Sequence, residues 1–523
     1  MKLCDLINVA DLRLYRGSGD HEVLDLVDDS RCVMPGSVFV ARCGSVTNSH
    51  IADAVARGAI AVIGSPGRAT AISSEVALAC PALPVSVDQV LAGRLAGAFF
   101  GWPATQLRVI GVTGTNGKTT TAWIARHLLQ QIGWKTGLIG TIVVDDGADP
   151  QLAELTTPGT IQMHRFLARM VANGCEAVVM EVSSHALHQH RIAGVSFDSA
   201  LFTNLSGDHL DYHGSMVAYA AAKAMLFDGL HDNAWAIVNA QDPYAPQMIR
   251  HTKGRIIHTG AGEDFHGPSS RISDVRLGLE QSRATFVGPW GSFPATLPLV
   301  GHHNLVNALQ AVTAVYALTE TPNRVLREAL ESCPRVPGRL ERVGGTDGHQ
   351  TPNVFVDYAH THDALEHVLK TLRPLVSSRL FVLIGCGGDR DRTKRAKMAR
   401  VACQQADWVY LTSDNPRTED PQAIIADMLV GVDPDIAGSP SAHCRTNGCG
   451  HGPEIRVIVD RAEAIRRCVL SAEPDDTVLL AGKGHENYQI VGQARRQFDD
   501  REHAARALGF WRKAQVPSCR IST

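Results

Sequence analysis

The sequence predicts an α/β fold of three domains, the central one a doubly wound, mostly parallel sheet. The length of 523 residues leaves room for about three domains at roughly 150 residues each. Short β-rich runs alternate with helical stretches along the chain, the pattern of strands joined by crossover helices. A glycine-rich loop at 111–120 follows an apolar run and precedes a helical stretch, as expected at the first strand of such a sheet.

The first predicted domain covers residues 1–102. Its runs Val38–Val40 and Ala59–Ile63 favour strands, and the Ala-rich stretches around them favour helices. The segment Gly101-Trp102-Pro103 follows, and Gly and Pro interrupt regular structure. We therefore expect a small α/β domain that ends at this linker.

The second predicted domain covers residues 103–335 and holds the glycine-rich loop. Four later apolar runs favour strands, and helical stretches separate them: 137–140, 177–180, 199–202 and 234–238. The Pro- and Gly-containing segment Arg335–Arg339 marks the next boundary.

The third predicted domain covers residues 336–523. Four apolar runs recur in it, and each ends in a polar or glycine-rich cluster: 357–360, 385–390, 414–417 and 482–486. Because ligands of open α/β sheets bind at the carboxyl ends of the strands, we expect these clusters to line one pocket.

Composition excludes several classes of function. With 50 Lys+Arg against 53 Asp+Glu, the net charge of -3 gives no general attraction to nucleic acid or to an anionic membrane. No apolar run approaches the roughly 18 residues of a membrane helix, and the first residues do not resemble a secretion signal. The twelve cysteines are scattered, which fits reduced thiols. We expect a cytoplasmic protein that is not inserted in a membrane.

The glycine-rich loop Gly111–Thr120 predicts a phosphate cradle. Its glycines let backbone N–H groups face a polyphosphate, Lys118 can reach the β- and γ-phosphates, and the Thr119 hydroxyl can ligate Mg²⁺. Val112 stands where the common form of this loop has glycine. No Asn-Lys-x-Asp sequence, the mark of guanine recognition, occurs in the chain, so we expect ATP rather than GTP.

Two later segments supply candidate metal ligands. Glu181 follows an apolar run, where a nucleotide-bound Mg²⁺ needs a second protein ligand. In the loop Asn204–Gly214 we expect His209 to be a ligand, Asp208 to cap the next helix and the other histidine to form hydrogen bonds. Lys223 lies in an amphipathic helical stretch, where composition alone places a lysine at the solvent.

Taken in order along the chain, these motifs resemble the Mur ligases of peptidoglycan synthesis. The segments that carry the resemblance are Gly111–Thr120, Thr156–Gly159, Glu181–His185, Asn204–Gly214, Lys223, Gly301–Asn304, Asp357–His360 and Asp414–Arg417. Within the family they are most similar to the ligases that add the third residue to UDP-MurNAc-L-Ala-D-Glu. The resemblance implies an N-terminal domain that holds the UDP-sugar, a central ATPase domain and a C-terminal Rossmann-like domain that receives the amino acid.

The resemblance also implies a mechanism and a set of site residues. ATP phosphorylates the side-chain carboxylate of D-Glu, and the incoming amine then attacks the acyl phosphate. Catalytic roles fall to Lys118, Lys223 and His209. Two Mg²⁺ ions are expected, one held through Thr119 and Glu181 and one through His209 and a CO₂-derived carbamate on Lys223.

The remaining implied contacts fall into two sets. ATP contacts are expected from Gly114, Thr115, Asn116, Gly117, Lys118, Thr119, Thr120, Asn304, Arg339 and Asp357. Contacts to UDP-MurNAc-dipeptide are expected from Ser30, Thr156, Thr157, Ser183, Gln189 and Arg191.

The incoming amino acid is expected to be meso-diaminopimelate. It carries a carboxylate and an ammonium at its far end, so its pocket needs cations as well as acids. Arg417 and Arg390 can bind the carboxylate, and Asp414 and Glu486 can accept the ammonium. Diaminopimelate-adding relatives share this Asp-Asn-Pro-Arg sequence, so the expected set is Arg390, Asp414, Asn415, Pro416, Arg417, Gly482 and Glu486.

Two alternatives stay open: a lysine-adding ligase of the same family, and a nucleotide-binding relative without catalysis. Folylpolyglutamate synthetase shares the phosphate loop, but the first domain and the Asp-Asn-Pro-Arg cluster disfavour it. Residues 45–49 depart from the family in the first domain. A loop with His443, Cys444, Cys449 and His451 fits no common zinc template, so we interpret it as a surface insertion. We expect a monomer.

Overall fold

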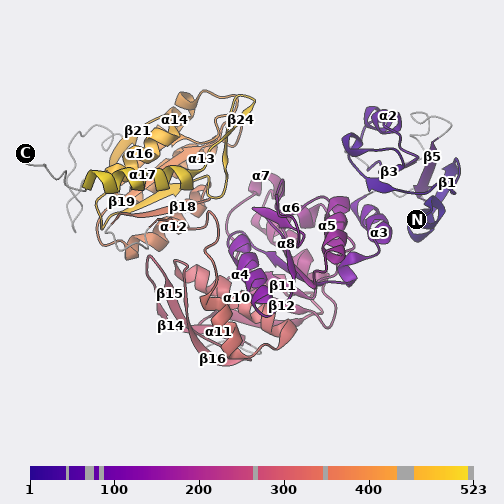
Figure 1. Ribbon diagram of the computed structural model, residues 1–523, viewed down its shortest axis with the longest axis horizontal. Helices are drawn as coiled ribbons and strands as arrows, with labels where there is room; N and C mark the ends of the chain where they lie inside the picture. The colour runs from indigo at the N-terminus through magenta and orange to yellow at the C-terminus, as the bar shows by residue number, and fades with distance from the viewer. Residues whose placement is uncertain are drawn as a thin grey trace, which may run out of the picture. The chain divides into compact units, whose positions relative to one another are not determined.

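The computed structural model describes residues 1–42, 46–64, 76–81, 88–262, 269–344, 351–432 and 453–515. Residue contacts divide the chain into two compact units. The first comprises Met1–Arg271, Val287–Ser292 and Asn307–Ala329, and the second comprises Ile272–Phe286, Phe293–Val306 and Leu330–Thr523. Each unit is built of sheets covered by helices (Figure 1), so the predicted α/β class is confirmed.

The N-terminal sheet has the strand order β1-β5-β4-β3-β2. Its strands are β1 (Leu12–Arg16), β2 (Asp25–Val27), β3 (Ser37–Val40), β4 (Ala61–Ile63) and β5 (Ala77–Pro81), and its helices are α1 (Leu3–Val9), α2 (Asn48–Ala56) and α3 (Gln89–Phe99). Neighbours from β2 to β5 pair in parallel, whereas β1 pairs antiparallel with β5. Both strands expected here are present as β3 and β4.

The sheet that carries the glycine-rich loop contains the parallel series β13-β12-β11-β6-β10-β7. These strands are β6 (Arg108–Thr113), β7 (Thr136–Ile139), β10 (Ala177–Glu181), β11 (Ser199–Phe202), β12 (Trp235–Asn239) and β13 (Arg255–Ala261). The four strands predicted after the loop correspond to β7, β10, β11 and β12. Short strands β8 (Val143–Asp145) and β9 (Gln151–Leu152) continue the sheet beyond β7 in antiparallel fashion.

The helices of this region follow the predicted alternation. They are α4 (Lys118–Gln131), α5 (Thr160–Ala172), α6 (Ser184–His188), α7 (Leu210–His213), α8 (Met216–Asp228), α9 (Ala245–Met248), α10 (His302–Thr319) and α11 (Asn323–Glu331). The further strands are β14 (Ser269–Arg276), β15 (Ser282–Gly288) and β16 (Gly291–Leu297), for which no strand was predicted.

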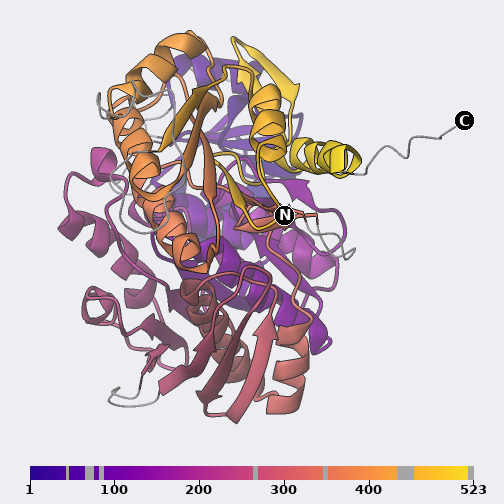
Figure 2. The same cartoon turned by 90° about the vertical axis from the view of Figure 1, so that its left-hand side faces the viewer.

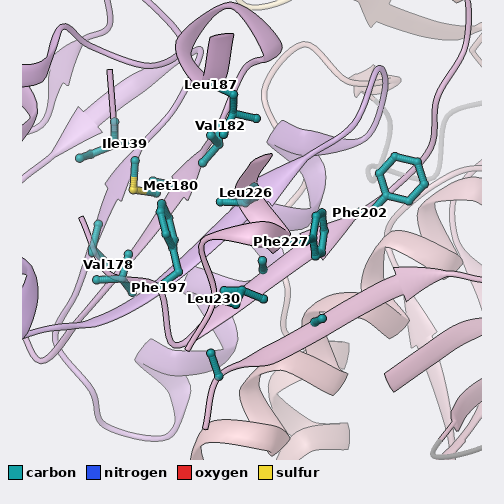
Figure 3. Packing of buried hydrophobic residues seen from close by; sticks show 14 of the residues in the cluster. Ile139, Val178, Met180, Val182, Leu187, Phe197, Phe202, Leu226, Phe227 and Leu230 are labelled. Atoms are coloured by element: carbon teal, nitrogen blue, oxygen red, sulfur yellow. The ribbon is translucent and has the colours of Figure 1, made fainter. Parts of the chain in front are cut away.

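An apolar cluster packs α5, α6 and α8 against the parallel strands. Figure 3 shows Phe197 beside Met180, and Phe227 between Leu226 and Phe202, all within this cluster. Phe202 and Phe227 are fully buried, and burying such a side chain contributes about 1.5–3 kcal/mol. This packing fixes α8 beside the carboxyl ends of β6 and β11, which is where the site residues lie.

The C-terminal sheet has the order β17-β18-β22-β19-β20-β21. Its strands are β17 (Glu341–Val343), β18 (Asn353–Asp357), β19 (Leu380–Cys386), β20 (Trp408–Ser413), β21 (Glu454–Val457) and β22 (Thr477–Ala481). All neighbours from β18 to β21 are parallel. The four predicted apolar runs are β18, β19, β20 and β22, so their polar clusters follow the carboxyl ends of adjacent strands.

Helices cover both faces of this sheet. One apolar layer includes α12 (His362–Leu372), α13 (Thr393–Gln405) and α14 (Pro421–Leu429), and the other includes α16 (Arg461–Leu470) and α17 (Asp500–Gln515). Figure 2 shows the orange helices on one side of the strands and the yellow helices on the other. A hairpin of β23 (Tyr488–Val491) and β24 (Ala494–Gln497) follows β22. Within the described ranges, no helix is long and apolar enough to cross a membrane.

Candidate active site

The glycine-rich loop joins β6 to α4, as its sequence predicts. Gly114 has a φ of +150°, and a Cβ there would lie 1.9 Å from Thr203 Oγ1. Gly117 is the N-cap of α4 with a φ of +86°, and a Cβ there would meet the Asn307 side chain at 2.6 Å. Glycine is therefore required at both positions, because any other side chain would be strained and would collide with a neighbour.

The residues that follow β11 hold the glycine-rich loop in place through hydrogen bonds. Thr115 N–H donates to the Asn204 carbonyl at 2.8 Å, and Asn116 N–H donates to Asn204 Oδ1 at 3.0 Å. The Thr203 hydroxyl donates to the Asn116 carbonyl at 2.6 Å. The loop is thus held at the N-terminus of a helix of 14 residues, an arrangement that favours anions. Lys118 Nζ donates to the Gly114 and Thr115 carbonyls, both at 2.9 Å.

Glu181, at the end of β10, lies beside the start of α4. Its Oε2 atom accepts hydrogen bonds from Thr119 Oγ1 at 2.9 Å and from Thr141 Oγ1 at 3.0 Å, and its Oε1 accepts one from the Thr141 N–H at 2.8 Å. The Glu181 residue is only 1% exposed. A hydroxyl and a carboxylate side by side offer the oxygen ligands that Mg²⁺ prefers, so this pair fits such an ion.

Lys223 is buried, with 1% exposure, which contradicts the expectation from composition that it reaches solvent. The reason is that α8 is apolar around most of its circumference and packs on several sides. Lys223 Nζ donates to the Gly114 carbonyl at 2.8 Å and lies 4.5 Å from the centre of the Tyr219 ring. Burial, and to a smaller extent the nearby Lys118 charge, lower the pKa of Lys223 well below its usual value.

His209 begins the short helix α7 with a left-handed backbone, φ +54°. Its ring centre lies 4.7 Å from that of His185 and 6.2 Å from that of Tyr219. Burial is the largest cause of the lowered pKa of His209, with contributions from Lys118 and Lys223, so its ring favours the neutral form that ligates metals. Lys223 is close enough to His209 for its charge to contribute to this lowering of the pKa.

In this loop, the position of Asp208 differs from the prediction and that of His213 agrees with it. Asp208 does not cap α7: its Oδ1 accepts the N–H of the adjacent His209 at 2.8 Å, and the cap position belongs to His209 itself. His213 Nε2 forms a hydrogen bond with Ser184 Oγ at 3.0 Å, as expected for a histidine that only hydrogen-bonds. The described residues contain no group of three or more His, Cys, Asp or Glu that could hold a metal ion.

Five residues expected at the UDP-sugar peptide lie together on the other side of Glu181. Thr157 Oγ1 donates to the Glu181 carbonyl at 2.9 Å, and the Ser183 N–H donates to Thr157 Oγ1 at 3.0 Å. Arg191 Nε donates to Gln189 Oε1 at 2.9 Å, and Arg191 Nη1 donates to the Thr157 carbonyl at 3.2 Å.

The hydroxyls of this group also serve local structure. Thr156 Oγ1 lies 3.1 Å from Thr141 Oγ1, and Ser183 caps α6 by accepting the Ala186 N–H at 3.2 Å. Ser30 lies apart in sequence, in the short 3-10 helix Ser30–Cys32 of the N-terminal sheet domain, and is 5% exposed.

Three expected ATP residues, Asn304, Arg339 and Asp357, belong to the second unit. Asn304 Nδ2 donates to the Val300 carbonyl at 2.8 Å. Asp357 accepts the N–H of Leu340 at 2.7 Å and that of Ala359 at 2.8 Å. Burial raises the pKa of Asp357, an effect that the Arg339 charge reduces.

Several residues expected to bind the amino acid lie together at the carboxyl edge of the C-terminal sheet. Asp414 and Asn415 follow β20, Gly482 follows β22, and Asn415 Nδ2 donates to Glu486 Oε2 at 3.0 Å. Asp414, Asn415 and Glu486 are therefore brought together. Burial raises the pKa of Glu486 against the opposing effect of Lys483, whereas for Asp414 the nearby Lys483 and Arg461 outweigh burial and the pKa is lowered.

Arg417 is held in place by the hairpin of β23 and β24. Its backbone is left-handed with φ +51°, its N–H donates to the Ile490 carbonyl at 3.1 Å, and its own carbonyl accepts the Gly492 N–H at 2.7 Å. Arg417 Nη1 donates to the Gly388 carbonyl at 2.8 Å, which places the guanidinium against the loop after β19. Arg390 lies on that same loop and donates to the Asp389 carbonyl at 3.4 Å.

Lys483 is the residue that sequence reasoning missed in this pocket. It lies between two glycines at 482 and 484, where a lysine is usually exposed, yet its side chain is 0% exposed. The signal that could have revealed it is its position directly after a buried strand, among the same polar clusters. The residues His443, Cys444, Cys449 and His451, and Ser45 of the 45–49 departure, lie outside the described residues.

Comparison with known proteins places these features in a family. Residues 112–315 match the Mur ligase middle domain, and residues 338–484 match the Mur ligase glutamate ligase domain. The two matches cover most of the glycine-rich loop and the strand ends at which the amino-acid site is expected.

Relatives match along almost the whole chain. A "UDP-N-acetylmuramoyl-L-alanyl-D-glutamate--2,6-diaminopimelate ligase" of Synechococcus elongatus is 44% identical over 93% of this chain and 95% of its own length. The protein of the same name from Bacillus licheniformis is 38% identical over 97% of this chain and 99% of its own. A solved structure of that name has a TM-score of 0.66 at 31% identity, and covers 98% of this chain and 99% of its own.

Proposed function

Because the chain belongs to the Mur ligase family, we propose that it is the ATP-dependent ligase that joins meso-diaminopimelate to the D-Glu side-chain carboxylate of UDP-MurNAc-L-Ala-D-Glu. The observation that carries the choice of amino acid is the gathering of Arg417, Asp414 and Glu486 at one sheet edge. A guanidinium and two carboxylates at the same sheet edge can bind both charges at the far end of diaminopimelate.

The first step activates the acceptor carboxylate. A carboxylate oxygen of D-Glu attacks the γ-phosphorus of ATP, the bond to the β,γ-bridging oxygen breaks, and an acyl phosphate and ADP result. Both reactants are anions, so positive groups must offset their repulsion. Lys118 and the backbone N–H groups of the glycine-rich loop do this at the phosphates, since the loop presents them at the start of α4.

The pair of Thr119 and Glu181 is proposed to hold Mg²⁺ on the nucleotide. The ion would supply further positive charge at the phosphate oxygens. Thr141 donates to both carboxylate oxygens of Glu181, and these hydrogen bonds fix the orientation of that side chain toward Thr119.

Lys223 is proposed to carry a carbamate formed from CO₂. Carbamate formation requires a neutral amine, and burial beside Lys118 favours the neutral amine of Lys223. The product is an anion within reach of His209, whose ring favours the neutral form, so the two side chains would together suit a second Mg²⁺.

The second step forms the amide. The amine of diaminopimelate, in its neutral form, attacks the acyl carbon and gives a tetrahedral intermediate. The carbon–oxygen bond to phosphate then breaks, the nitrogen loses its proton, and amide and inorganic phosphate are released. The chain's contribution is to hold the two reactants in place while water is excluded.

The acceptor is proposed to bind at Ser30, Thr156, Thr157, Ser183, Gln189 and Arg191. Arg191 can pair with a peptide carboxylate, and its contacts to Gln189 and Thr157 orient it for this role. ATP is proposed to contact residues 114–120 together with Asn304, Arg339 and Asp357. We also propose the domain boundaries 1–102, 103–335 and 336–523, a monomeric state and a cytoplasmic location.

A ligation assay tests the proposal. The purified chain is incubated with ATP, Mg²⁺, UDP-MurNAc-L-Ala-D-Glu and either meso-diaminopimelate or L-lysine, and phosphate release and the ligated product are measured. We expect release that requires both the nucleotide-sugar peptide and diaminopimelate. Preference for L-lysine would support the lysine-adding alternative, and nucleotide binding without phosphate release would support the non-catalytic one.

A further inference from the structure

Lys483 lies among the residues proposed to bind the amino acid, but its side chain is fully enclosed by protein. Its Nζ donates to the Tyr488 carbonyl at 2.7 Å, to Asn415 Oδ1 at 3.1 Å and to Glu486 Oε2 at 3.4 Å. An ammonium group has three N–H donors, so these acceptors use all of them. Lys483 therefore has no donor left for a substrate, and any role it has must act through its neighbours.

One such neighbour is the Asn415 amide. Its Oδ1 accepts from Lys483 and from the Ile490 N–H at 3.0 Å, so the oxygen must face the lysine. The Nδ2 group is then turned toward Glu486, to which it donates at 3.0 Å. The opposite orientation would direct an NH₂ group at the Lys483 ammonium and at the Ile490 N–H, so these two donors together determine which way Asn415 points.

The charge around Lys483 is unbalanced. Asp414 Oδ1 lies 3.3 Å and Glu486 Oε2 lies 3.4 Å from Nζ, so two carboxylates share one ammonium. The next buried cation, Arg461, is occupied by Asp500 at 2.6 Å. With both carboxylates ionised the group carries one excess negative charge, which is complementary to one further cation.

Lys483 also keeps the carboxylates able to accept that cation. Burial acts on both acids in the direction that favours protonation, and Lys483 is the largest opposing influence on each. Without Lys483, Glu486 would lose a hydrogen-bond donor, Asp414 would lose its ion pair, and the two acids would face each other as like charges.

We infer that Lys483 is a positioning residue for amino-acid selection: it holds Asn415 and Glu486 in the orientation, and the acids in the charge state, that receive the distal ammonium of the incoming amino acid. This inference rests on the proposed function, because it specifies how the same pocket recognises its substrate. It assigns the lysine no contact with the substrate itself.

The test compares Michaelis constants in the complete ligation assay. Methionine has a side chain of similar length to lysine but no charge. In Lys483→Met we expect the KM for diaminopimelate to rise by about tenfold or more, because Asn415 and Glu486 would no longer be held in place. The KM for ATP should change by less than about twofold, because the nucleotide contacts are untouched. Lys483→Gln, which is shorter and keeps an amide donor, replaces the methionine variant if that variant does not fold.

Arg379→Met is the matched control. Arg379 also pairs with a buried carboxylate, Asp476, but at the opposite end of β22, so its loss should lower the melting temperature without changing either KM. If both Lys483 variants behave like Arg379→Met, the inference is wrong and Lys483 is only structural. If the unsubstituted chain does not ligate diaminopimelate at all, the proposed function fails first, and the inference fails with it.

Discussion

Lys223 Nζ and the Gly114 carbonyl oxygen are 2.8 Å apart, although the two residues are more than a hundred positions apart in the chain. The same oxygen accepts a hydrogen bond from Lys118 at 2.9 Å. One peptide unit of the glycine-rich loop thus contacts both lysines proposed for catalysis. Two like charges meet at this oxygen, which adds to the effect of burial in favouring a neutral Lys223.

Replacing Lys223 by Arg is expected to lower the rate of ligation by about a hundredfold or more, as the loss of a preorganised charged group does. Arginine keeps a positive charge but cannot form a carbamate at neutral pH, because its pKa is too high. Phosphate release measures the rate. In ¹³C-bicarbonate, the unsubstituted chain should show a carbamate NMR signal that the variant lacks; full activity in the variant would show that no carbamate is needed.

Replacing Arg417 by Lys is expected to raise the KM for diaminopimelate by about 10–150-fold, the usual cost of a lost hydrogen bond to a charged group. Lysine keeps the charge but lacks the planar fork that grips a carboxylate with two N–H groups. The KM for ATP, measured in the same assay, should stay within about twofold. Arg392→Lys is the matched control, since Arg392 is exposed and pairs with Glu419. Equal changes in both Michaelis constants would refute the assignment of Arg417.

Stability should fall in acid partly because of His303. Burial, with the nearby His367 and His302, lowers the pKa of His303 to about 3. Below about pH 6.5 the unfolded chain takes up a proton at this position while the folded chain does not, so stability is lost as pH falls from 6.5 toward 3. His303→Phe should therefore lose about 2 kcal/mol less stability than the unsubstituted chain between pH 7.5 and pH 5.

Calorimetric melting of the full chain at both pH values measures this difference. The comparison is between the two changes with pH, so any constant effect of the phenylalanine cancels. The two proteins would lose the same stability on acidification if His303 were protonated in the folded state.

The ion pair between Arg461 and Asp500 should be essential for stability. Both side chains are 0% exposed, and Arg461 Nη2 donates to Asp500 Oδ2 at 2.6 Å. Asp500→Asn leaves a buried charge without its partner, which costs about 3–5 kcal/mol. Thermal denaturation measures the loss. Glu502→Gln, which breaks an exposed pair with Arg506 on the same helix, should cost less than about 1 kcal/mol; similar losses in the two variants would contradict the prediction.

The sequence predicts much of this fold because its rules are local. An apolar run followed by Gly114 and Gly117 specifies a strand, a tight loop and a helix, and the strand-end rule places Asp414 and Glu486 at one edge. Those inferences need no knowledge of distant contacts. The alternation of strands and helices likewise follows from periodicity alone.

The parts that were not predicted depend on packing between distant segments. Lys223 and Lys483 look like solvent-facing lysines in their own segments, and only the surroundings supplied by other strands and helices show that they are buried. The hairpin of β23 and β24 supports Arg417 through backbone hydrogen bonds, which no side-chain pattern reveals. Asp208 was expected to cap a helix, but the left-handed backbone of His209 takes that position.

Glu181 forms hydrogen bonds toward both proposed substrate sites. Its carboxylate accepts from Thr119 on the nucleotide side, and its backbone carbonyl accepts from Thr157 on the acceptor side. The Thr119 and Thr157 hydroxyls are therefore both hydrogen-bonded to one residue, and the length of its side chain separates them. Aspartate, shorter by one methylene, would keep the charge but change that length, so this position should tolerate no substitution over evolutionary time.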